Sequence, residues 1–214
     1  MHETQAGSRE RMAAARPGGA KAAVPAKRHA ILDAALDLFR HYGYRRTSME
    51  DIAGAAGVAK GTLYLYFESK EDLFEALARQ LSTQVQDALR AAAARDLPLD
   101  GKVLALLDAK LGFFYRWVLS SPHAAELVDS RARLPGDIFE PLERSFRAAI
   151  VKTLREGART GEIDPKAAGL SLEAAADTLI AAAHGAETGA ASEAEFRDLL
   201  GRITRLSLRG LRGN

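Results

Sequence analysis

The chain has 214 residues, of which 47% are hydrophobic, so it can build a core and allows one or two domains. It contains no cysteine, which excludes disulfides and thiolate metal sites, and no apolar run approaches the roughly 20 residues that span a bilayer. The net charge is only +2, but residues 1–28 carry six basic and two acidic side chains. We therefore expect a cytoplasmic protein with no membrane partner, and any attraction to a polyanion should be local.

The first 26 residues show little periodicity. They contain many alanines, two prolines and the pair Gly18-Gly19, so we interpret residues 1–26 as a mobile arm. Two interpretations of this arm stay open. It is either a tail without function or a basic arm that contacts the phosphates or the minor groove of DNA.

A first short helix is expected after residue 47. Thr47 with Glu50, or Ser48 with Asp51, fits a capping box at its start, and both pairs remain possible. Gly57 can adopt the left-handed conformation that ends a helix. A second helix follows at once, and helix, short glycine-containing turn and helix is the layout of a DNA-binding helix-turn-helix.

The second helix, over residues 59–67, has an unusual outward side. At about 100° per residue, Leu63 and Phe67 face inward. The opposite side presents residues that a plain surface helix rarely combines, namely Gly61, Thr62, Tyr64 and Leu65. Gly61 costs roughly 1 kcal/mol of helix propensity, which makes sense where backbone approaches a groove wall. We expect Gly61 and Thr62 to approach base edges, and Leu65 either to contact a thymine methyl or simply to be exposed.

A third helix begins after Ser69, which can cap it with Asp72 three residues later. Its positive N-terminal end, with Lys70 beside it, suits a phosphate group. We therefore expect Lys70 to position the protein on DNA without reading the sequence.

From about Ile31 to Leu77 the chain resembles the tetracycline-repressor (TetR) family of bacterial transcription regulators. The residues that carry the resemblance are Thr47-Ser48, Asp51-Ile52-Ala53, Ala56-Gly57-Val58, Lys60-Gly61-Thr62-Leu63-Tyr64, Tyr66-Phe67 and Lys70. The resemblance implies a double-stranded DNA operator as partner, with Thr47, Tyr64 and Tyr66 helping to position the backbone. Together with the helical map, it assigns DNA binding to Thr47, Ser48, Lys60, Gly61, Thr62, Tyr64, Leu65, Tyr66 and Lys70.

Beyond the helix-turn-helix the sequence shows only helical patterns, with no strand pattern and no internal repeat. Helices are expected at residues 27–42, 71–95, 102–120, 122–133, 139–159, 171–187 and 193–211. The fold class is therefore all-α, with about nine helices. We divide the chain into the arm 1–26, a DNA-binding domain 27–73, and a domain 74–214 to which the resemblance assigns ligand binding and dimerisation.

Aromatic residues cluster near the middle of the chain. They are either the core of a helical domain or the wall of a small-molecule pocket, and the resemblance implies that such a pocket exists. The candidate pocket residues are Phe113, Phe114, Trp117, Phe146 and His184. They suggest a small apolar or aromatic effector, with His184 as the best polar candidate because it lies in an otherwise alanine-rich helix.

The last two expected helices carry an alanine-rich face and a continuous apolar stripe. These features favour either packing within one chain or, as the resemblance implies, a four-helix interface in a homodimer. The candidate interface residues are Leu179, Ala183, Phe196, Leu199, Ile203 and Leu206.

No catalytic arrangement is visible in the sequence. The five histidines show no metal-binding spacing, and Ser121, His123 and Asp129 lack the context of a nucleophile elbow. We expect no cofactor, no metal and no enzyme activity. The leading hypothesis is a repressor released from a palindromic operator by an effector. The alternatives are a ligand-independent dimeric DNA-binding protein and an enzyme with an accessory helix-turn-helix.

Overall fold

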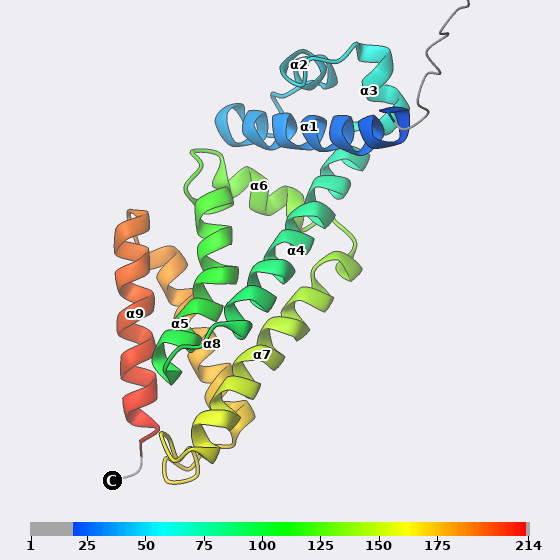
Figure 1. The fold of residues 1–214 in the computed structure, drawn as a ribbon. Coiled ribbons are helices and arrows are strands. Elements are labelled where there is room, and N and C mark those ends of the chain that lie inside the picture. The colour runs from blue at the N-terminus through cyan, green and yellow to red at the C-terminus, as the bar shows by residue number, and fades with distance from the viewer. Residues whose placement is uncertain (1–18, 213–214) are drawn as a thin grey trace, which may run out of the picture.

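The computed structural model describes residues 19–212, in which every regular element is helical, as Figure 1 shows. This confirms the all-α fold class. The α-helices of this range are α1 (Gly19–Tyr42), α2 (Met49–Ala55), α3 (Lys60–Tyr66), α4 (Lys70–Ala94), α5 (Leu99–Leu107), α6 (Ala124–Arg131), α7 (Glu140–Arg159), α8 (Leu172–Gly189) and α9 (Glu193–Gly210). Within the described residues, none of these helices is both long and apolar enough to cross a membrane.

The first helix begins earlier than expected. Helix α1 starts at Gly19, so residues 19–26, which were expected in the arm, form its first two turns. Four alanines in this stretch favour helix over coil, although the stretch has no apolar stripe. The rest of the arm, including its possible DNA contact, lies outside the described residues.

The described part of the molecule contains two hydrophobic cores that share α4. The upper core joins α1, α2, α3 and the first two turns of α4, and includes Ile31, Ile52, Leu63, Phe67 and Leu77. The lower core joins the far half of α4 to α5, α7, α8 and α9. We call the parts of the chain that build these cores the upper unit and the lower unit. In Figure 1, α4 runs from the upper unit to the lower one and connects them.

The aromatic segment after α5 is not an ordinary α-helix. The expected helix over residues 102–120 continues from α5 as two π-helical segments, η1 (Asp108–Gly112) and η2 (Tyr115–Leu119). A π turn has an extra residue, which changes the direction of the side chains that follow, and such turns are frequent at functional sites. The spacing of apolar residues alone could not reveal this change.

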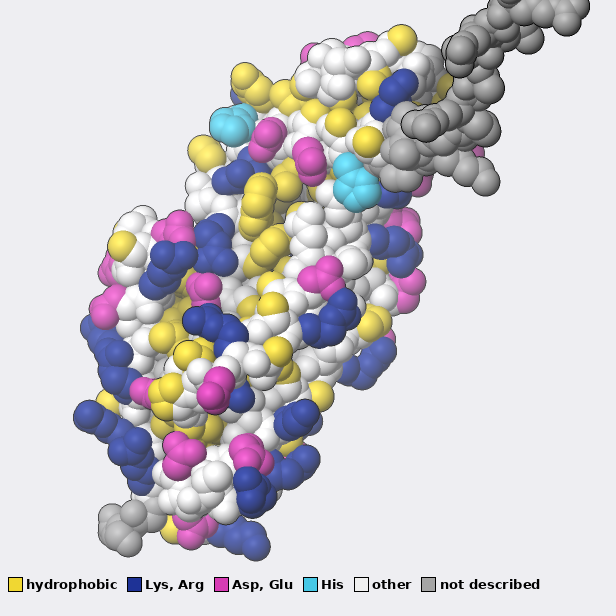
Figure 2. All heavy atoms as spheres, viewed as in Figure 1, with side chains coloured by type: hydrophobic (Ala, Val, Ile, Leu, Met, Phe, Trp, Pro, Cys, Tyr) yellow, Lys and Arg dark blue, Asp and Glu magenta, His cyan; other side chains and the backbone are white. Residues whose placement is uncertain are grey.

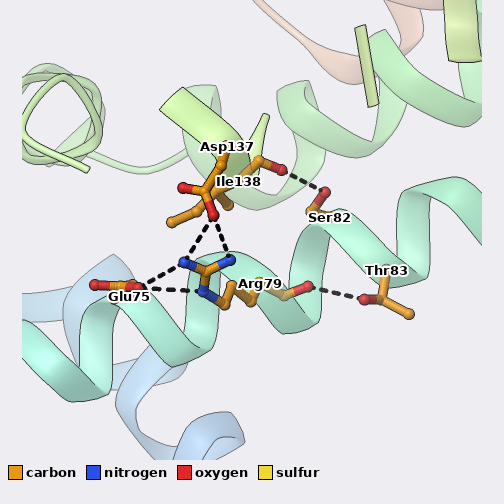
Figure 3. Close-up of polar contacts among 6 residues, drawn as sticks. All are labelled: Glu75, Arg79, Ser82, Thr83, Asp137 and Ile138. Carbon is orange, nitrogen blue, oxygen red and sulfur yellow. Dashed lines mark hydrogen bonds and ion pairs between the residues drawn. The ribbon is translucent and has the colours of Figure 1, made fainter. Parts of the chain in front are cut away.

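The connection between α6 and α7 is fastened to α4, as Figure 3 shows. It contains a short 3₁₀ helix, η3 (Gly136–Ile138). The guanidinium of Arg79 donates to Asp137 Oδ2 from two nitrogens, each at 3.2 Å, and also donates to Glu75. Nearby, the buried Ser82 hydroxyl donates to the carbonyl of Ile138 at 3.1 Å. These bonds hold the α6–α7 connection against the middle of α4.

Two leucines of α3 allow a matched test of which side of the helix faces the core. Leu63 is 0% exposed, so Leu63→Ala should lower the free energy of unfolding by about 2–5 kcal/mol. Leu65 is 86% exposed, so Leu65→Ala should change it by less than about 0.5 kcal/mol. Denaturant unfolding of both variants measures the difference, and equal losses would contradict the orientation of α3.

Candidate nucleic-acid interface and adjoining cavity

Helix α2 is capped at its start by the second of the two possible capping boxes, Ser48 with Asp51. The Ser48 hydroxyl accepts a hydrogen bond from the backbone N–H of Asp51 at 3.1 Å, and the Asp51 carboxylate accepts one from the N–H of Ser48 at 2.9 Å. Thr47 is 3% exposed, and its hydroxyl donates to the Gly43 carbonyl at 2.8 Å. The structure therefore gives the Thr47 side chain a role inside the loop, whereas the sequence analysis assigned it to the DNA surface.

Helix α3 presents an open face on the side away from α1. Leu65 projects from this face, and Tyr64 beside it is 41% exposed. A Cβ added at Gly61 would meet nothing within 4 Å, so the backbone is uncovered there. Thr62 and Tyr66 are half-buried. This face has the shape that a recognition helix needs, because backbone and an apolar side chain can both reach a groove.

One cation at the start of α3 is already paired. Lys60 forms an ion pair with Glu50 of α2, and its ammonium lies 6.0 Å from the ring centre of Tyr64. The hydrogen bond from Lys60 lowers the pKa of the Glu50 carboxyl, and the same bond raises the pKa of Lys60. Both groups are exposed, so a phosphate can compete with Glu50 for the ammonium.

Lys70 reaches back to the loop that precedes α2. Its ammonium donates to the carbonyls of Tyr44 and Thr47, each at 3.0 Å, and lies 4.6 Å from the ring centre of Tyr44. The Tyr44 hydroxyl donates to Glu71 at 3.2 Å. Burial, followed by the charge of Glu71, raises the pKa of Tyr44 to about 12. Lys70 thus has loop carbonyls as partners at the position where the sequence analysis expected a phosphate.

A cavity of about 160 Å³ lies where the upper unit meets the lower one. The upper unit contributes Leu36, Phe39 and Phe74 to its wall, and the lower unit contributes residues of η1, η2, α7 and α8. Helix α6 lines the cavity between them with Leu127, which belongs to the upper core, and Arg131. Figure 2 shows apolar side chains exposed beneath the first three helices. Of the residues proposed from sequence, the lining includes Phe113, Phe114, Trp117 and His184.

Phe146 does not line the cavity. It is 1% exposed and belongs to the lower core, one layer behind the wall, where the ammonium of Lys110 lies 4.7 Å from its ring centre. The helical stripe of α7 correctly predicts that Phe146 faces inward. A stripe does not distinguish a core position from a cavity wall, because both face the same way.

The wall also holds charged residues that the sequence analysis missed. Lys110 is 7% exposed, and its ammonium lies 2.6 Å from Glu143 Oε2. Arg131 reaches the other oxygen of Glu143 at 4.0 Å. The sequence does contain a signal for a buried lysine. Lys110 lies three residues after Leu107 and four before Phe114, on an apolar stripe where a lysine is unexpected.

Polar contacts join the end of α1 to the segment containing η2 and α6. The Ser121 hydroxyl donates to the Arg40 carbonyl at 2.6 Å, and Arg40 donates to the Arg116 carbonyl at 3.1 Å. Glu126 of α6 accepts from the backbone N–H of Arg45 at 2.5 Å. At Gly43, where φ is +88°, a Cβ would lie 2.5 Å from Glu126 Oε2, so a larger residue would strain the backbone and displace the Glu126 carboxylate.

The proposed interface residues fall into two groups. Leu179, Ala183 and Phe196 are at most 1% exposed and belong to the lower core of the single protomer. Leu199 and Ile203 are half-buried, and Leu206 is 70% exposed. The first three are therefore unavailable to a second chain, because the apolar stripe also serves the packing of α8 and α9 on their own protomer.

Comparisons with known proteins agree with this geometry. Residues 31–77 match the model of the family described as bacterial regulatory proteins, tetR family. Over 135 residues the chain is 30% identical to the uncharacterized HTH-type transcriptional regulator YhgD of Bacillus subtilis (strain 168), covering 63% of this chain and 71% of that protein. Over 59 residues it is 52% identical to the HTH-type transcriptional regulator RutR of Escherichia coli (strain K12), covering 28% of each.

A solved structure has the same fold over nearly its whole length. It is a transcriptional regulator of the TetR/AcrR family from Thermobifida fusca, which superposes with a TM-score of 0.65 at 27% identity and covers 87% of this chain and 99% of that one. The helix-turn-helix, the fold and the similarity to YhgD lead to one conclusion. The chain belongs to the TetR family of bacterial regulatory proteins.

Proposed function

We propose that this TetR-family regulator is a dimeric repressor that leaves its operator when a small apolar or aromatic molecule enters the cavity. The observation that carries the proposal is the composition of the cavity wall, to which α1 of the DNA-binding unit contributes Leu36 and Phe39. A ligand in contact with both units can favour one of their relative positions over another. Differential contact of this kind is what a ligand needs to shift an equilibrium between two states.

The proposed movement passes through α4 and α6. A ligand between Phe74 of α4 and Leu127 of α6 pushes against two helices that both touch α1. The polar contacts of Ser121 and Glu126 then carry the displacement to Arg40 and Arg45. In a dimer, this changes the distance between the two α3 helices. Two recognition helices must match major grooves one helical turn apart, about 34 Å, so a shift of a few Å lowers affinity.

Two other functions are weaker proposals. A ligand-independent DNA-binding protein has no use for a cavity between its two units. An enzyme with an accessory helix-turn-helix would need reactive groups at that cavity, and the polar groups on its wall are occupied by contacts such as the Lys110–Glu143 ion pair and the His184–Glu187 hydrogen bond. We therefore propose a protein without enzyme activity, located in the cytoplasm where its DNA lies.

We propose a second copy of this chain as the partner of α8 and α9. The exposed side of α8 carries small residues, namely Thr178, Ala181, Ala182 and Gly185, and Leu206 of α9 lies exposed on the neighbouring helix. Small residues allow close helix approach, and an exposed leucine costs free energy until it is covered. In the proposed interface, these exposed residues take the place of Leu179, Ala183 and Phe196, which are buried in their own protomer.

The proposed DNA binding is tested by selecting operators from random DNA. The affinities of protein variants are then measured for the selected operator and for versions of it with single base changes. Leu65→Ala should lose about 1 kcal/mol at one symmetric pair of base positions, with an unchanged salt dependence, because a thymine methyl is lost. Lys70→Ala should weaken binding to all sequences alike. We expect little change in its salt dependence, because the loop carbonyls already occupy the ammonium.

Two results would reverse these roles. A uniform loss for Leu65→Ala would show that Leu65 does not read bases. A decrease of about one unit in the salt slope per protomer for Lys70→Ala would show that Lys70 contacts a DNA phosphate. Failure of the unaltered protein to select any sequence would overturn the proposed function itself.

The dimer is tested by a charge at its proposed centre. Leu206→Glu should yield monomers in sedimentation velocity, since a carboxylate would be buried without a partner in the seam. Leu65→Glu is the matched control, because the same substitution at an exposed leucine of α3 should leave the dimer intact. Dimers of equal stability in both variants would place the interface elsewhere.

A further inference from the structure

We propose that the cavity takes a molecule with one carboxylate and an apolar body about the size of an aromatic ring, and that Lys110 and Arg131 bind the carboxylate. This inference rests on the proposed function in taking the cavity as the effector site. It adds the chemical class of the effector, which the apolar wall alone does not define.

The first cation is Lys110. Its side chain is buried, with the ammonium paired to Glu143 at 2.6 Å and placed near the ring of Phe146. A buried ammonium is costly unless it is well paired. Its partner can be displaced, because the Glu143 side chain is 47% exposed and can turn to water when another carboxylate binds.

The second cation is Arg131 of α6. Its guanidinium carbon lies 4.2 Å from the ring centre of Phe139 and 5.4 Å from that of Phe114, so aromatic rings hold it in the wall. Its ion pair with Glu143 is long, at 4.0 Å. Two cations thus share one carboxylate. A guanidinium has the planar donor geometry that matches a carboxylate, so a second carboxylate would complete the site.

The other hydrogen-bonded pair on the wall belongs to α8. His184 Nδ1 lies 3.2 Å from Glu187 Oε2, so the acid of this pair has a partner of its own. A neutral histidine would leave Glu187 as a site for a cationic ligand, which makes an amine the rival chemistry. We favour the acid, because Lys110 and Arg131 have one carboxylate between them, whereas Glu187 has a partner to itself.

The apolar part of the cavity limits the size of the ligand body. Its wall includes Leu81, Val85, Phe113 and Trp117. An apolar cavity of about 150 Å³ holds benzene, so the 160 Å³ here is suited to one ring with a short chain. The π-helical segment η1 contains Lys110, which places the charged group beside this apolar space.

The experiment compares three probes that share one body, 3-phenylpropanoate, 3-phenylpropanol and 3-phenylpropylamine. Calorimetric titration of the intact protein should show the acid binding at least about tenfold more tightly than the alcohol or the amine, because its hydrogen bonds are charge-assisted. Lys110→Met should reduce the preference for the acid over the alcohol to less than about threefold. Lys102→Met, the same change on the same run of helix but outside the cavity wall, should keep the full preference.

Thermal unfolding shows whether each variant is folded, and Lys110→Gln provides a second uncharged variant if Lys110→Met is not. Equal binding of the three probes, tighter binding of the amine, or no binding of the acid at millimolar concentration would overturn the inference. So would a preference for the acid that survives both Lys110 variants. If the acid binds through Lys110 but does not release a selected operator, the ligand class stands and the effector role in the proposed function fails.

Discussion

The shared use of α4 by two hydrophobic cores is the constraint on which the rest of the structure depends. Leu73 and Leu77 belong to the upper core, whereas Val85 and Leu89 belong to the lower one. Between these pairs, α4 lines the cavity. Dense packing fixes the position of a helix, and a cavity removes part of that packing where the two cores meet. The relative position of the two units is therefore least constrained at the place where a ligand can enter.

Polar contacts across the same junction link α6 to the DNA-binding unit. The end of α1 is bonded to the segment around α6 through Ser121 and Glu126. Because Leu127 of α6 is also part of the upper core, α6 is attached to the DNA-binding unit by both polar and apolar contacts. In the proposed mechanism, a displacement of α6 by a ligand beside Arg131 would therefore be transmitted to α1 through these contacts. The Lys70 bonds to the loop after α1 then couple that loop to α4.

Local features of the helix-turn-helix were predictable from sequence because their causes are local. The turn glycine Gly57 and the inward Leu63 each depend on neighbours within four positions. Local spacing also limited the capping box of α2 to two pairs, and the structure selects Ser48 with Asp51. The partners of Lys70 and Lys110 lie more than twenty residues away in the chain, so no local spacing reveals them. The same limit explains the dimer residues, since an apolar stripe predicts burial without specifying whether its own protomer or a second chain provides the cover.

Filling the cavity without any ligand tests the proposed release from DNA most directly. Ala78 lines it from α4 and is 6% exposed, so Ala78→Phe should place a ring in the space where the effector is proposed to bind. Ala91→Phe, on an exposed position of the same helix, is the matched control. Ala78→Phe should remain a folded dimer and bind a selected operator about tenfold or more weakly, a coupling of the usual allosteric size. If the cavity is filled but the operator affinity equals that of the Ala91→Phe control, the proposed coupling between cavity and DNA binding is wrong.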